Sequence, residues 1–284
     1  MVLDKAGNLF GAAAGINSGI VYEISAADEE KIVYTFSGGA DDPPPLSLIQ
    51  DSAGNFYANA GGGITGYGTL LKLTAGGAKQ ILYSFHGPSD GEHPNSPLLL
   101  DSQGNIYGTT LYGGPNHAGT IFKLATDGTF TTLYAFGNGK IDALYPYAGL
   151  IFDSQGNLYG TSGYGGANDY GTVFELTTAN TLKILYSFKG GHKDGQLPEA
   201  SLIFDGQGNL YGTTSDNPNA EGPFGTVFEL TAQGEEIVLH SFTGAPDGFN
   251  PVTSLIMDQR GNLYGTTQGG YIAYAGGTVF EVAP

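Results

Sequence analysis

The sequence predicts an all-β fold, a six-bladed β-propeller, and three observations lead to that prediction. The stretch DGQGNLYGTT, at Asp205–Thr214, recurs in near-copies along the chain. The Gly-Asn pairs of these copies are spaced 47, 50, 52, 52 and 53 residues apart and begin at Gly7, Gly54, Gly104, Gly156, Gly208 and Gly261. Each repeat also contains short segments rich in β-branched and aromatic residues, and a four-stranded unit of roughly 40–50 residues is typical of a propeller blade.

The fourth repeat illustrates the four expected strands, which are bounded by Gly, Asn, Asp or Pro. They read AGLIFD (148–153), NLYGTS (157–162), GTVFEL (171–176) and KILYSF (183–188). The first is almost wholly apolar, so we expect it to be the innermost strand and to be buried on both sides. Asp153 and Gly156 suit the first and fourth positions of a type I turn, so the repeated aspartate and Gly-Asn pair are expected to close a hairpin.

Tight and long connections alternate between these strands. TTANTL joins the third strand to the fourth, whereas GYGGANDY and KGGHKDGQLPE are long, so all long loops are expected on one face. The aspartates of the long loops are expected to make turn hydrogen bonds, at Asp90, Asp142, Asp194 and Asp247. His240 replaces the tyrosine of an LYSF copy and is expected to be a packed structural residue. Glycines of the second strand would let neighbouring blades approach closely, at Gly108, Gly160, Gly212 and Gly265.

The repeats predict a single domain over residues 1–284, because one repeat is too small to bury a core by itself. They cover approximately residues 1–42, 43–92, 93–144, 145–196, 197–249 and 250–284. The sixth repeat reaches Pro284 without an LYSF copy, so we expect a last blade of three strands. Five closed blades with a remainder are the alternative.

Four motifs resemble a known family of tandem repeats. They are GNLYGTT, GTVFEL, LYSF and the pattern D-G-x-x-P, which occurs at Asp194–Pro198 and Asp247–Pro251. Together they resemble the GloVer (Gloeo/Verruco) repeats of bacterial, largely secreted or cell-surface proteins, over essentially the whole chain. The resemblance implies a propeller-like fold and a secreted or cell-surface location, although no signal peptide is recognisable at the start of the chain. The first two repeats depart most, with NLFGAA and NFYANA in place of NLYGTT.

The composition excludes several classes of function. The formal net charge is −17, from 27 acidic and 10 basic residues. Such a surface repels phosphate backbones, so we expect no nucleic-acid partner, and no run is apolar enough for membrane insertion. The absence of cysteine removes disulfides, thiolate metal sites and a cysteine nucleophile. We expect a monomer that needs no organic cofactor.

The long loops differ between repeats, whereas the strands are nearly copied. The loops between strands two and three read LYGGPNHA, GYGGANDY, SDNPNAEGPF and QGGYIAYAG, and the residue after the repeated proline changes as well. A lectin with one sugar pocket in each blade would repeat its loops, usually around an aromatic side chain. Divergent loops favour a single asymmetric site on the propeller axis, and unconstrained drift of the loops is the alternative explanation.

The candidate site residues lie in these divergent loops. Carboxylates there could supply the hard oxygen ligands that calcium prefers, at Glu92, Asp169, Glu199 and Asp216. His93 and His117 could act as catalytic general bases near neutral pH. The side chains expected to bind substrate are Asn95, Tyr112 and Tyr147.

These residues lead to two functional hypotheses. The first is a calcium-assisted hydrolase of small lactones or esters, in which the metal polarises the carbonyl and a loop histidine or carboxylate activates water. It rests on the fold, because no lactonase motif matches residue by residue. The second is a lectin-like, carbohydrate-binding propeller of the cell surface without catalysis. The expected partner is therefore a small molecule or a glycan.

Overall fold

The structure, a computed structural model, describes residues 1–14, 19–39, 44–191, 193–215, 224–244, 246–268 and 276–283. Its strands form six small antiparallel blade sheets, one for each repeat, together with one two-stranded sheet between loops, and no helix occurs among the described residues. The fold is therefore a six-bladed β-propeller, as the sequence predicts. The chain divides into two compact units, Met1–Ala135 with blades 1 to 3 and Phe136–Pro284 with blades 4 to 6.

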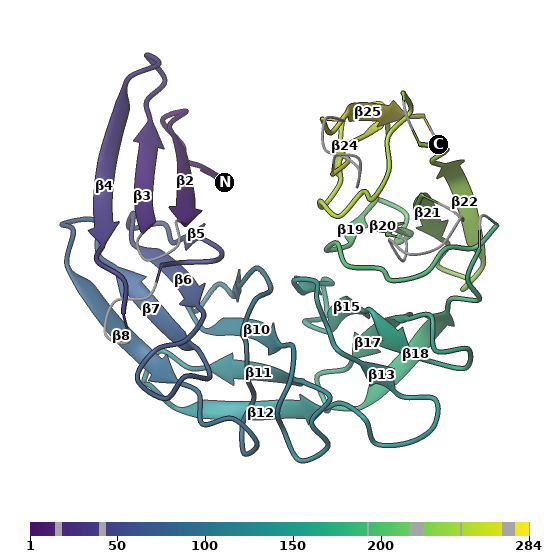
Figure 1. The fold of residues 1–284 in the computed structure, drawn as a ribbon, viewed down its shortest axis with the longest axis horizontal. Helices are drawn as coiled ribbons and strands as arrows, with labels where there is room; N and C mark the ends of the chain where they lie inside the picture. The colour runs from purple at the N-terminus through teal and green to yellow at the C-terminus, as the bar shows by residue number, and fades with distance from the viewer. Residues whose placement is uncertain are drawn as a thin grey trace. The chain divides into compact units, whose positions relative to one another are not determined.

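Unit 1 contains three blades of four strands that pair in chain order (Figure 1). Blade 1 consists of β1 (Val2–Leu3), β2 (Leu9–Ala14), β3 (Gly19–Ile24) and β4 (Glu30–Phe36). Blade 2 consists of β5 (Ile49–Gln50), β6 (Phe56–Ala60), β7 (Thr69–Leu73) and β8 (Lys79–Ser84). Blade 3 consists of β9 (Leu99–Leu100), β10 (Ile106–Thr110), β11 (Thr120–Leu124) and β12 (Phe130–Ala135).

Unit 2 repeats this plan with a shorter last blade. Blade 4 consists of β14 (Ile151–Phe152), β15 (Leu158–Ser162), β17 (Thr172–Leu176) and β18 (Leu182–Ser187). Blade 5 consists of β19 (Ile203–Phe204), β20 (Leu210–Thr214), β21 (Thr226–Leu230) and β22 (Glu236–Ser241). Blade 6 has the three strands that the sequence predicts, β23 (Ile256–Met257), β24 (Leu263–Thr266) and β25 (Val279–Val282), within the described residues. Two long loops of unit 2 also pair, through β13 (Ala143–Leu144) and β16 (Tyr164–Gly165).

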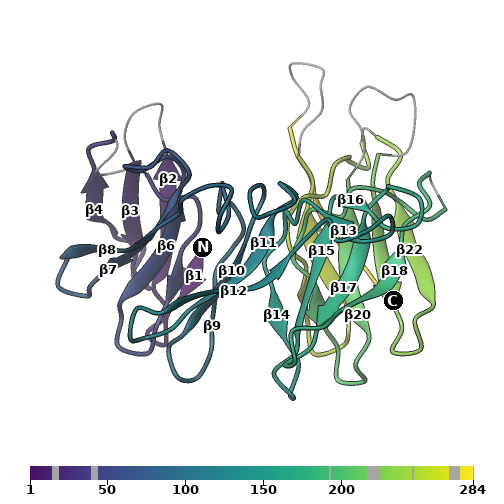
Figure 2. The same cartoon turned by 90° about the horizontal axis from the view of Figure 1, so that it is seen from below.

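The tight turns lie at one end of each unit and the long loops at the other (Figure 2). We call these the tight-turn end and the long-loop end. In blade 3, Asp101 Oδ1 accepts hydrogen bonds from the backbone N–H groups of Gln103 and Asn105, both at 2.9 Å. The Gly104 N–H donates to the Asp101 carbonyl oxygen at 3.0 Å, which confirms the predicted type I turn. Burial opposes ionisation, but the hydrogen bonds from Asn105 hold the pKa of Asp101 below its ordinary value.

In blades 1 to 5 the asparagine of the Gly-Asn pair joins the two tight turns of its blade. Asn105 Nδ2 donates to Asp101 Oδ2 at 2.7 Å, and Asn105 Oδ1 accepts from the Thr126 backbone N–H of the other turn at 3.2 Å. The same two contacts recur at Asn8, Asn55, Asn157 and Asn209. The repeated aspartate and Gly-Asn letters are therefore structural.

A phenylalanine after the fourth strand packs into the next blade of the same unit. Phe188 is fully buried, and its ring meets the Phe228 ring of blade 5 edge-on with centroids 5.2 Å apart. Two further pairs have centroids 5.3 and 5.0 Å apart, Phe85–Phe122 and Phe242–Phe280. Burying such a ring is worth about 1.5–3 kcal/mol, and an edge-on pair adds about 0.5–1.5 kcal/mol. This contact belongs to the apolar cluster that joins neighbouring blades of a unit.

The repeated glycine of the second strand has a different role from the predicted one. Gly212 pairs with Phe228 across strands β20 and β21. A Cβ on Gly212 would lie 2.7 Å from Phe228 Cζ and 2.9 Å from Leu202 Cδ2, and both side chains belong to the same blade. The prediction that this glycine lets neighbouring blades approach is therefore wrong. It makes room for the phenylalanine of its own blade, and the same holds at Gly108, Gly160 and Gly265.

The first strand is shorter and less enclosed than predicted. In blade 5 only Ile203 and Phe204 form β19, and both are half-buried, whereas the preceding Leu202 is 1% exposed. The prediction of burial on both sides is wrong for the strand itself. It fails because the strand ends at the tight-turn end, where Phe204 lines a groove between blades.

The two threonines of NLYGTT supply buried hydroxyl groups. Thr213 Oγ1 donates to the Pro251 carbonyl oxygen of the next blade at 2.5 Å. Thr214 Oγ1 lies 2.8 Å from Thr226 Oγ1 on the third strand of its own blade. Each buried hydroxyl thus has a partner, as burial of a polar group requires. These letters are structural as well.

Phe188→Ala is expected to lower the free energy of unfolding by about 3–5 kcal/mol, because it leaves a cavity beside Phe228. The matched control is Ile237→Ala in β22, where the side chain is 40% exposed, and its expected cost is below about 1 kcal/mol. Urea unfolding followed by tyrosine fluorescence measures both. Equal losses in the two variants would contradict the role given to the buried ring.

Candidate functional site

Five of the predicted site residues lie at the long-loop end of unit 1. Glu92 and Tyr112 pair as an isolated β-bridge, with N···O distances of 2.8 and 3.1 Å. The ring of His93 meets the Tyr112 ring edge-on with centroids 5.7 Å apart. Loop pairing therefore joins the backbones of Glu92 and Tyr112, and it brings the imidazole of His93 against the phenol of Tyr112. Asn95 and His117 are exposed, and the described contacts do not join them to it.

Tyr147 and Glu199 lie on neighbouring segments at the long-loop end of unit 2. Each follows the repeated proline and precedes a first strand. Two residues further along, the Gly149 backbone N–H donates to Ser201 Oγ at 2.9 Å. This hydrogen bond holds the two segments side by side, so a predicted substrate-binding ring and a predicted carboxylate share one part of the unit.

The described residues do not gather the predicted calcium ligands into one donor set. Asp169 accepts a hydrogen bond from the Gly165 backbone N–H at 2.9 Å and has a φ of 61°, so it serves its own turn. Asp216 lies outside the described residues. In the part of the chain that the structure describes, no three His, Asp or Glu side chains lie close enough to hold a metal ion. The calcium ion stays a prediction.

Glu199 combines burial with few polar contacts. Ser215 Oγ donates to Glu199 Oε2 at 3.3 Å and to the Leu197 carbonyl oxygen at 3.1 Å. Burial raises the pKa of Glu199 above its ordinary value of 4.5, and the bond from Ser215 only partly opposes the shift. Among the described residues, no lysine, arginine or histidine forms an ion pair with it. A desolvated carboxyl group of this kind is a candidate for proton transfer.

The repeated loop aspartates make the turn hydrogen bonds that the sequence predicts. Each accepts a bond from a backbone N–H earlier in its loop at 2.7 to 2.9 Å, in the pairs His86–Asp90, Asn138–Asp142, Lys189–Asp194 and Thr243–Asp247. His240 Nε2 lies 3.1 Å from Asp247 Oδ1, and its ring packs edge-on against Phe242. The structural role predicted for His240 is thus confirmed.

Comparison of the fourth strands reveals a carboxylate that sequence reasoning missed. In unit 1 the Tyr83 hydroxyl donates to Asp90 Oδ2, and the Tyr83 ring stacks on Phe130 of the next blade with centroids 3.9 Å apart. Phe130 is the first residue of β12, and Glu236 is the first residue of β22. Glu236 therefore stands where the other unit has a stacked ring, beside Tyr186. Alignment of the repeats alone shows this exchange and could have found it.

The surroundings of Glu236 disfavour its ionised form. Burial, followed by the negative charge of Asp194, raises the pKa of Glu236 to about 7, although Lys189 and a hydrogen bond from Tyr186 oppose the shift. Its Oε1 is buried and has no hydrogen-bond partner in the described ranges. Asp194 itself has Lys189 Nζ at 3.4 Å. The joint between blades 4 and 5 thus contains a carboxyl that titrates near neutral pH.

Residues 1–222 match a family described as the Gloeobacter/Verrucomicrobia repeat. The chain belongs to this family. The match confirms the resemblance that the repeated motifs indicate. No curated protein is similar enough to count as a relative.

Several solved propellers share the fold of this family member at low sequence identity. A putative gluconolactonase is 18% identical over 93% of this chain and 80% of its own, with a TM-score of 0.50. The gluconolactonase XC5397 from Xanthomonas campestris is 16% identical over 93% and 78%, with a TM-score of 0.54. Virginiamycin B lyase from Staphylococcus aureus is 15% identical over 83% and 69%, with a TM-score of 0.52. At these identities the likeness is one of fold.

A membrane-spanning helix is also absent from the described residues, since none of them forms a long apolar helix.

Glu236→Gln is expected to make the thermal unfolding midpoint less dependent on pH between about 5 and about 8. Because the folded-state pKa of Glu236 is raised to about 7, its protonated form stabilises the native state fully below 4.5, and this contribution is lost as the pH rises through 7. The wild-type midpoint should therefore fall across this range relative to the variant, as followed by circular dichroism.

Two further variants serve as references for this titration. Glu236→Phe copies the Tyr83–Phe130 arrangement and should raise the midpoint most at the alkaline end of the range. Glu235→Gln removes an exposed carboxylate next in the chain and should leave the pH dependence of the wild type intact. Parallel curves for the wild type and Glu236→Gln would show that Glu236 does not titrate near neutral pH.

Proposed function

We propose that the protein hydrolyses small lactones or esters, with Glu199 as the general base. The six-bladed fold occurs in proteins described as gluconolactonases, which is compatible with this activity. The observation that carries the proposal is the half-buried Glu199 carboxyl at the long-loop end, whose pKa burial raises and which no cation neutralises among the described residues. It carries more weight than the fold, because one fold hosts many activities.

The proposed reaction moves one proton twice. Ionised Glu199 accepts a proton from water while the water oxygen forms a bond to the substrate carbonyl carbon. The tetrahedral intermediate then collapses, the bond between this carbon and the leaving oxygen breaks, and Glu199 returns the proton to that oxygen. A raised pKa of Glu199 suits both proton transfers, from water and to the leaving oxygen. It brings the acid and base forms of the carboxyl closer in free energy near neutral pH.

Ser215 and Tyr147 are the proposed supporting residues. The Ser215 hydroxyl, 3.3 Å from Glu199 Oε2, orients the carboxylate and leaves its other oxygen for water. Tyr147 lies on the adjacent segment, which the bond between Gly149 and Ser201 positions, and its ring would contact the apolar part of the substrate. His93, with its neighbours Glu92 and Tyr112, and the separate His117 remain the bases and ligands predicted from the sequence for unit 1.

The calcium ion and the secreted or cell-surface location belong to the same proposal. A calcium ion held by loop carboxylates would polarise the substrate carbonyl. The described residues provide no three-carboxylate set for it, so none of the proton transfers above depends on a metal. The location rests on the family resemblance.

Glu199→Gln is expected to lower kcat/KM on a panel of gluconolactone, butyrolactone and nitrophenyl esters by about 10²–10⁴-fold, the usual contribution of a general base. The wild-type rate should rise with pH as Glu199 loses its proton, with a midpoint above 4.5. Because an ionised, desolvated carboxylate destabilises the native state above that midpoint, the variant should also unfold at a higher temperature at pH 8. Loss of activity with a gain of stability separates a catalytic role from a structural one.

Glu235→Gln is the matched control, since Glu235 is exposed in the tight turn of blade 5 and should leave both properties unchanged. Full activity of Glu199→Gln would overturn the assignment of the base, and an inactive wild type on the whole panel would overturn the proposed activity.

Removal of calcium tests the metal separately. With EDTA, turnover of the most reactive panel substrate should fall and should recover when calcium is added back, because a Lewis acid on the carbonyl would be lost and restored. Magnesium at the same concentration is the control for a general salt effect. Turnover that EDTA leaves unchanged would contradict the calcium requirement and leave Glu199 as the sole proposed catalyst.

A further inference from the structure

Two grooves of the same construction lie at the tight-turn end, one in each unit. The first, of about 360 Å³, separates blades 2 and 3 of unit 1, and the second, of about 460 Å³, separates blades 4 and 5 of unit 2. Both volumes fall within the range of about 300–1,000 Å³ that small-molecule sites occupy. Neither groove includes a residue of the proposed hydrolytic site, which lies at the opposite end of unit 2.

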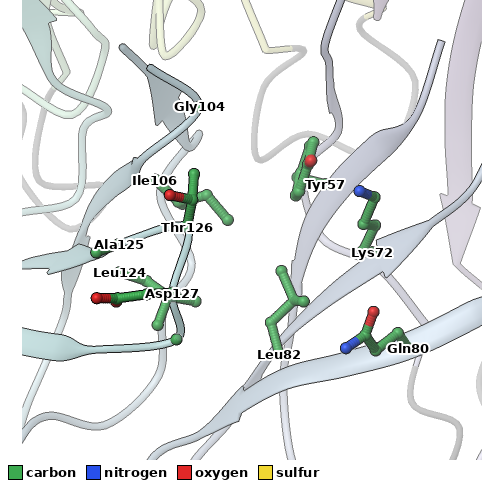
Figure 3. Close-up of a pocket in the computed structure, with 11 residues that line it drawn as sticks. Tyr57, Lys72, Gln80, Leu82, Gly104, Ile106, Leu124, Ala125, Thr126 and Asp127 are labelled. Atoms are coloured by element: carbon green, nitrogen blue, oxygen red, sulfur yellow. The ribbon is translucent and has the colours of Figure 1, made fainter. Parts of the chain in front are cut away.

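Equivalent positions line both grooves. One wall consists of a second-strand tyrosine and a fourth-strand leucine, Tyr57 with Leu82 in unit 1 and Tyr159 with Leu185 in unit 2. The facing wall belongs to the next blade and contains two apolar strand residues and a tight turn, Ile106, Leu124 and 125–128 in unit 1 and Leu210, Leu230 and 231–234 in unit 2. Figure 3 shows the two walls of the first groove facing each other, with Tyr57, Lys72, Gln80 and Leu82 opposite Ile106 and the turn that bears Asp127, whose carboxyl group points away from the facing wall.

Polar side chains surround these apolar residues, and each charged lining residue has an opposite charge in its groove or beside it. In unit 1, Lys72 Nζ lies 5.2 Å from the Tyr57 ring centroid, and Asp127 carries the opposite charge on the facing turn. In unit 2, Glu175 is the charged lining residue, and it accepts a hydrogen bond at 3.1 Å from Lys183 Nζ, which lies outside the lining. The protein as a whole carries a net charge of −17. Two locally neutral grooves on such a surface favour an uncharged ligand over a cation or an anion.

We propose that the two grooves bind neutral saccharides. A sugar ring has apolar C–H faces and a rim of hydroxyl groups, so it matches a floor of tyrosine and leucine side chains with polar groups around it. The amides of Gln80 and Gln233 each offer donors and acceptors to those hydroxyls from an exposed position in their groove. Because the two grooves have the same construction, we expect both to bind saccharides. Their saccharide preferences should differ, because the tight turn contributes Asp127 in unit 1 and Gln233 in unit 2.

This inference goes beyond the proposed hydrolase and does not depend on it. Binding at either groove would hold the protein on a neutral polysaccharide and leave the long-loop end of the same unit free.

Calorimetric titration of the whole protein with neutral tetrasaccharides tests the proposal, and cellotetraose, laminaritetraose and mannotetraose are the probes. Two sites are expected for at least one probe, with dissociation constants on the order of 0.1–1 mM. Thr126→Trp fills the first groove and Ala232→Trp fills the second, so each should halve the number of sites and the double variant should abolish binding. Gln103→Trp and Gln207→Trp are the controls, because they place the same side chain on the neighbouring tight turn of the same blades and should retain both sites.

A milder pair guards against misfolding of the tryptophan variants. Gln80→Ala with Gln233→Ala should weaken binding about 3-fold to 10-fold, the effect of losing one hydrogen bond at each site, with an unchanged unfolding midpoint. No heat change with any probe, or full binding by the Thr126→Trp and Ala232→Trp double variant, would overturn the proposal. Lactone turnover by the double variant should equal that of the wild type, so failure of the saccharide sites and failure of the hydrolase are distinguishable.

Discussion

The packing of one phenylalanine ring into the next blade is the constraint on which the rest of the structure depends. Phe188 reaches Phe228 only because Gly212 leaves space for the Phe228 ring within its own blade. The contact between the Phe188 and Phe228 rings sets the separation of the two blades. At this separation the Thr213 hydroxyl lies within hydrogen-bond distance of the Pro251 carbonyl oxygen, which belongs to the next blade. In unit 2 the equivalent Thr161 also donates to the next blade, to the Ala200 carbonyl oxygen at 3.4 Å.

The same separation produces both candidate sites, at opposite ends of the blades. At the long-loop end, neighbouring segments come close enough for Gly149 to bond Ser201, and this contact places Tyr147 beside the segment of Glu199. At the tight-turn end, a groove lies between blades 4 and 5. The scaffold letters are copied because they set this spacing. Positions outside these repeated letters, such as Glu199, can change between repeats, and a change there can create a binding or catalytic group.

The copies within the chain also act as references for one another. Phe130 and Glu236 occupy equivalent positions in two blades. Phe130 stacks on the tyrosine of the preceding blade, whereas Glu236 places a partly desolvated carboxyl there. A stacked ring contributes apolar burial at every pH, whereas the carboxyl makes the joint between blades 4 and 5 sensitive to protons. Two nearly identical joints between blades can therefore differ in their sensitivity to pH because of a single side chain.

The sequence predicted the features that local chemistry determines. Strand periodicity, the type I turn at Asp101 and the three strands of the last blade all follow from neighbouring letters, and the structure agrees with them. It did not predict the role of Gly212, since the space beside a glycine depends on which blade supplies the neighbouring ring. The predicted burial of the first strand on both sides was wrong because the strand ends at the tight-turn end, where Phe204 lines a groove.

The candidate site was predictable to a similar extent. Glu92, His93 and Tyr112 come together because two long loops pair, although the sequence does not show that pairing. Asp169 could not be recognised as a turn residue without its backbone angle. Glu199 is predicted from the sequence as a metal ligand, and only the assembled blades reveal the burial that raises its pKa.

The link between the two tight turns has a consequence for the durability of the protein. Asn105 serves as donor to Asp101 and as acceptor for Thr126, and the bond to Asp101 requires an intact amide. Spontaneous deamidation would replace the donor with a second carboxylate, 2.7 Å from Asp101 Oδ2, and repulsion between the two carboxylates would open the tight turn that contains both residues. Asn8, Asn55, Asn157 and Asn209 make the same contacts. The protein therefore has several sites at which deamidation over time would loosen one blade without a change in the gene.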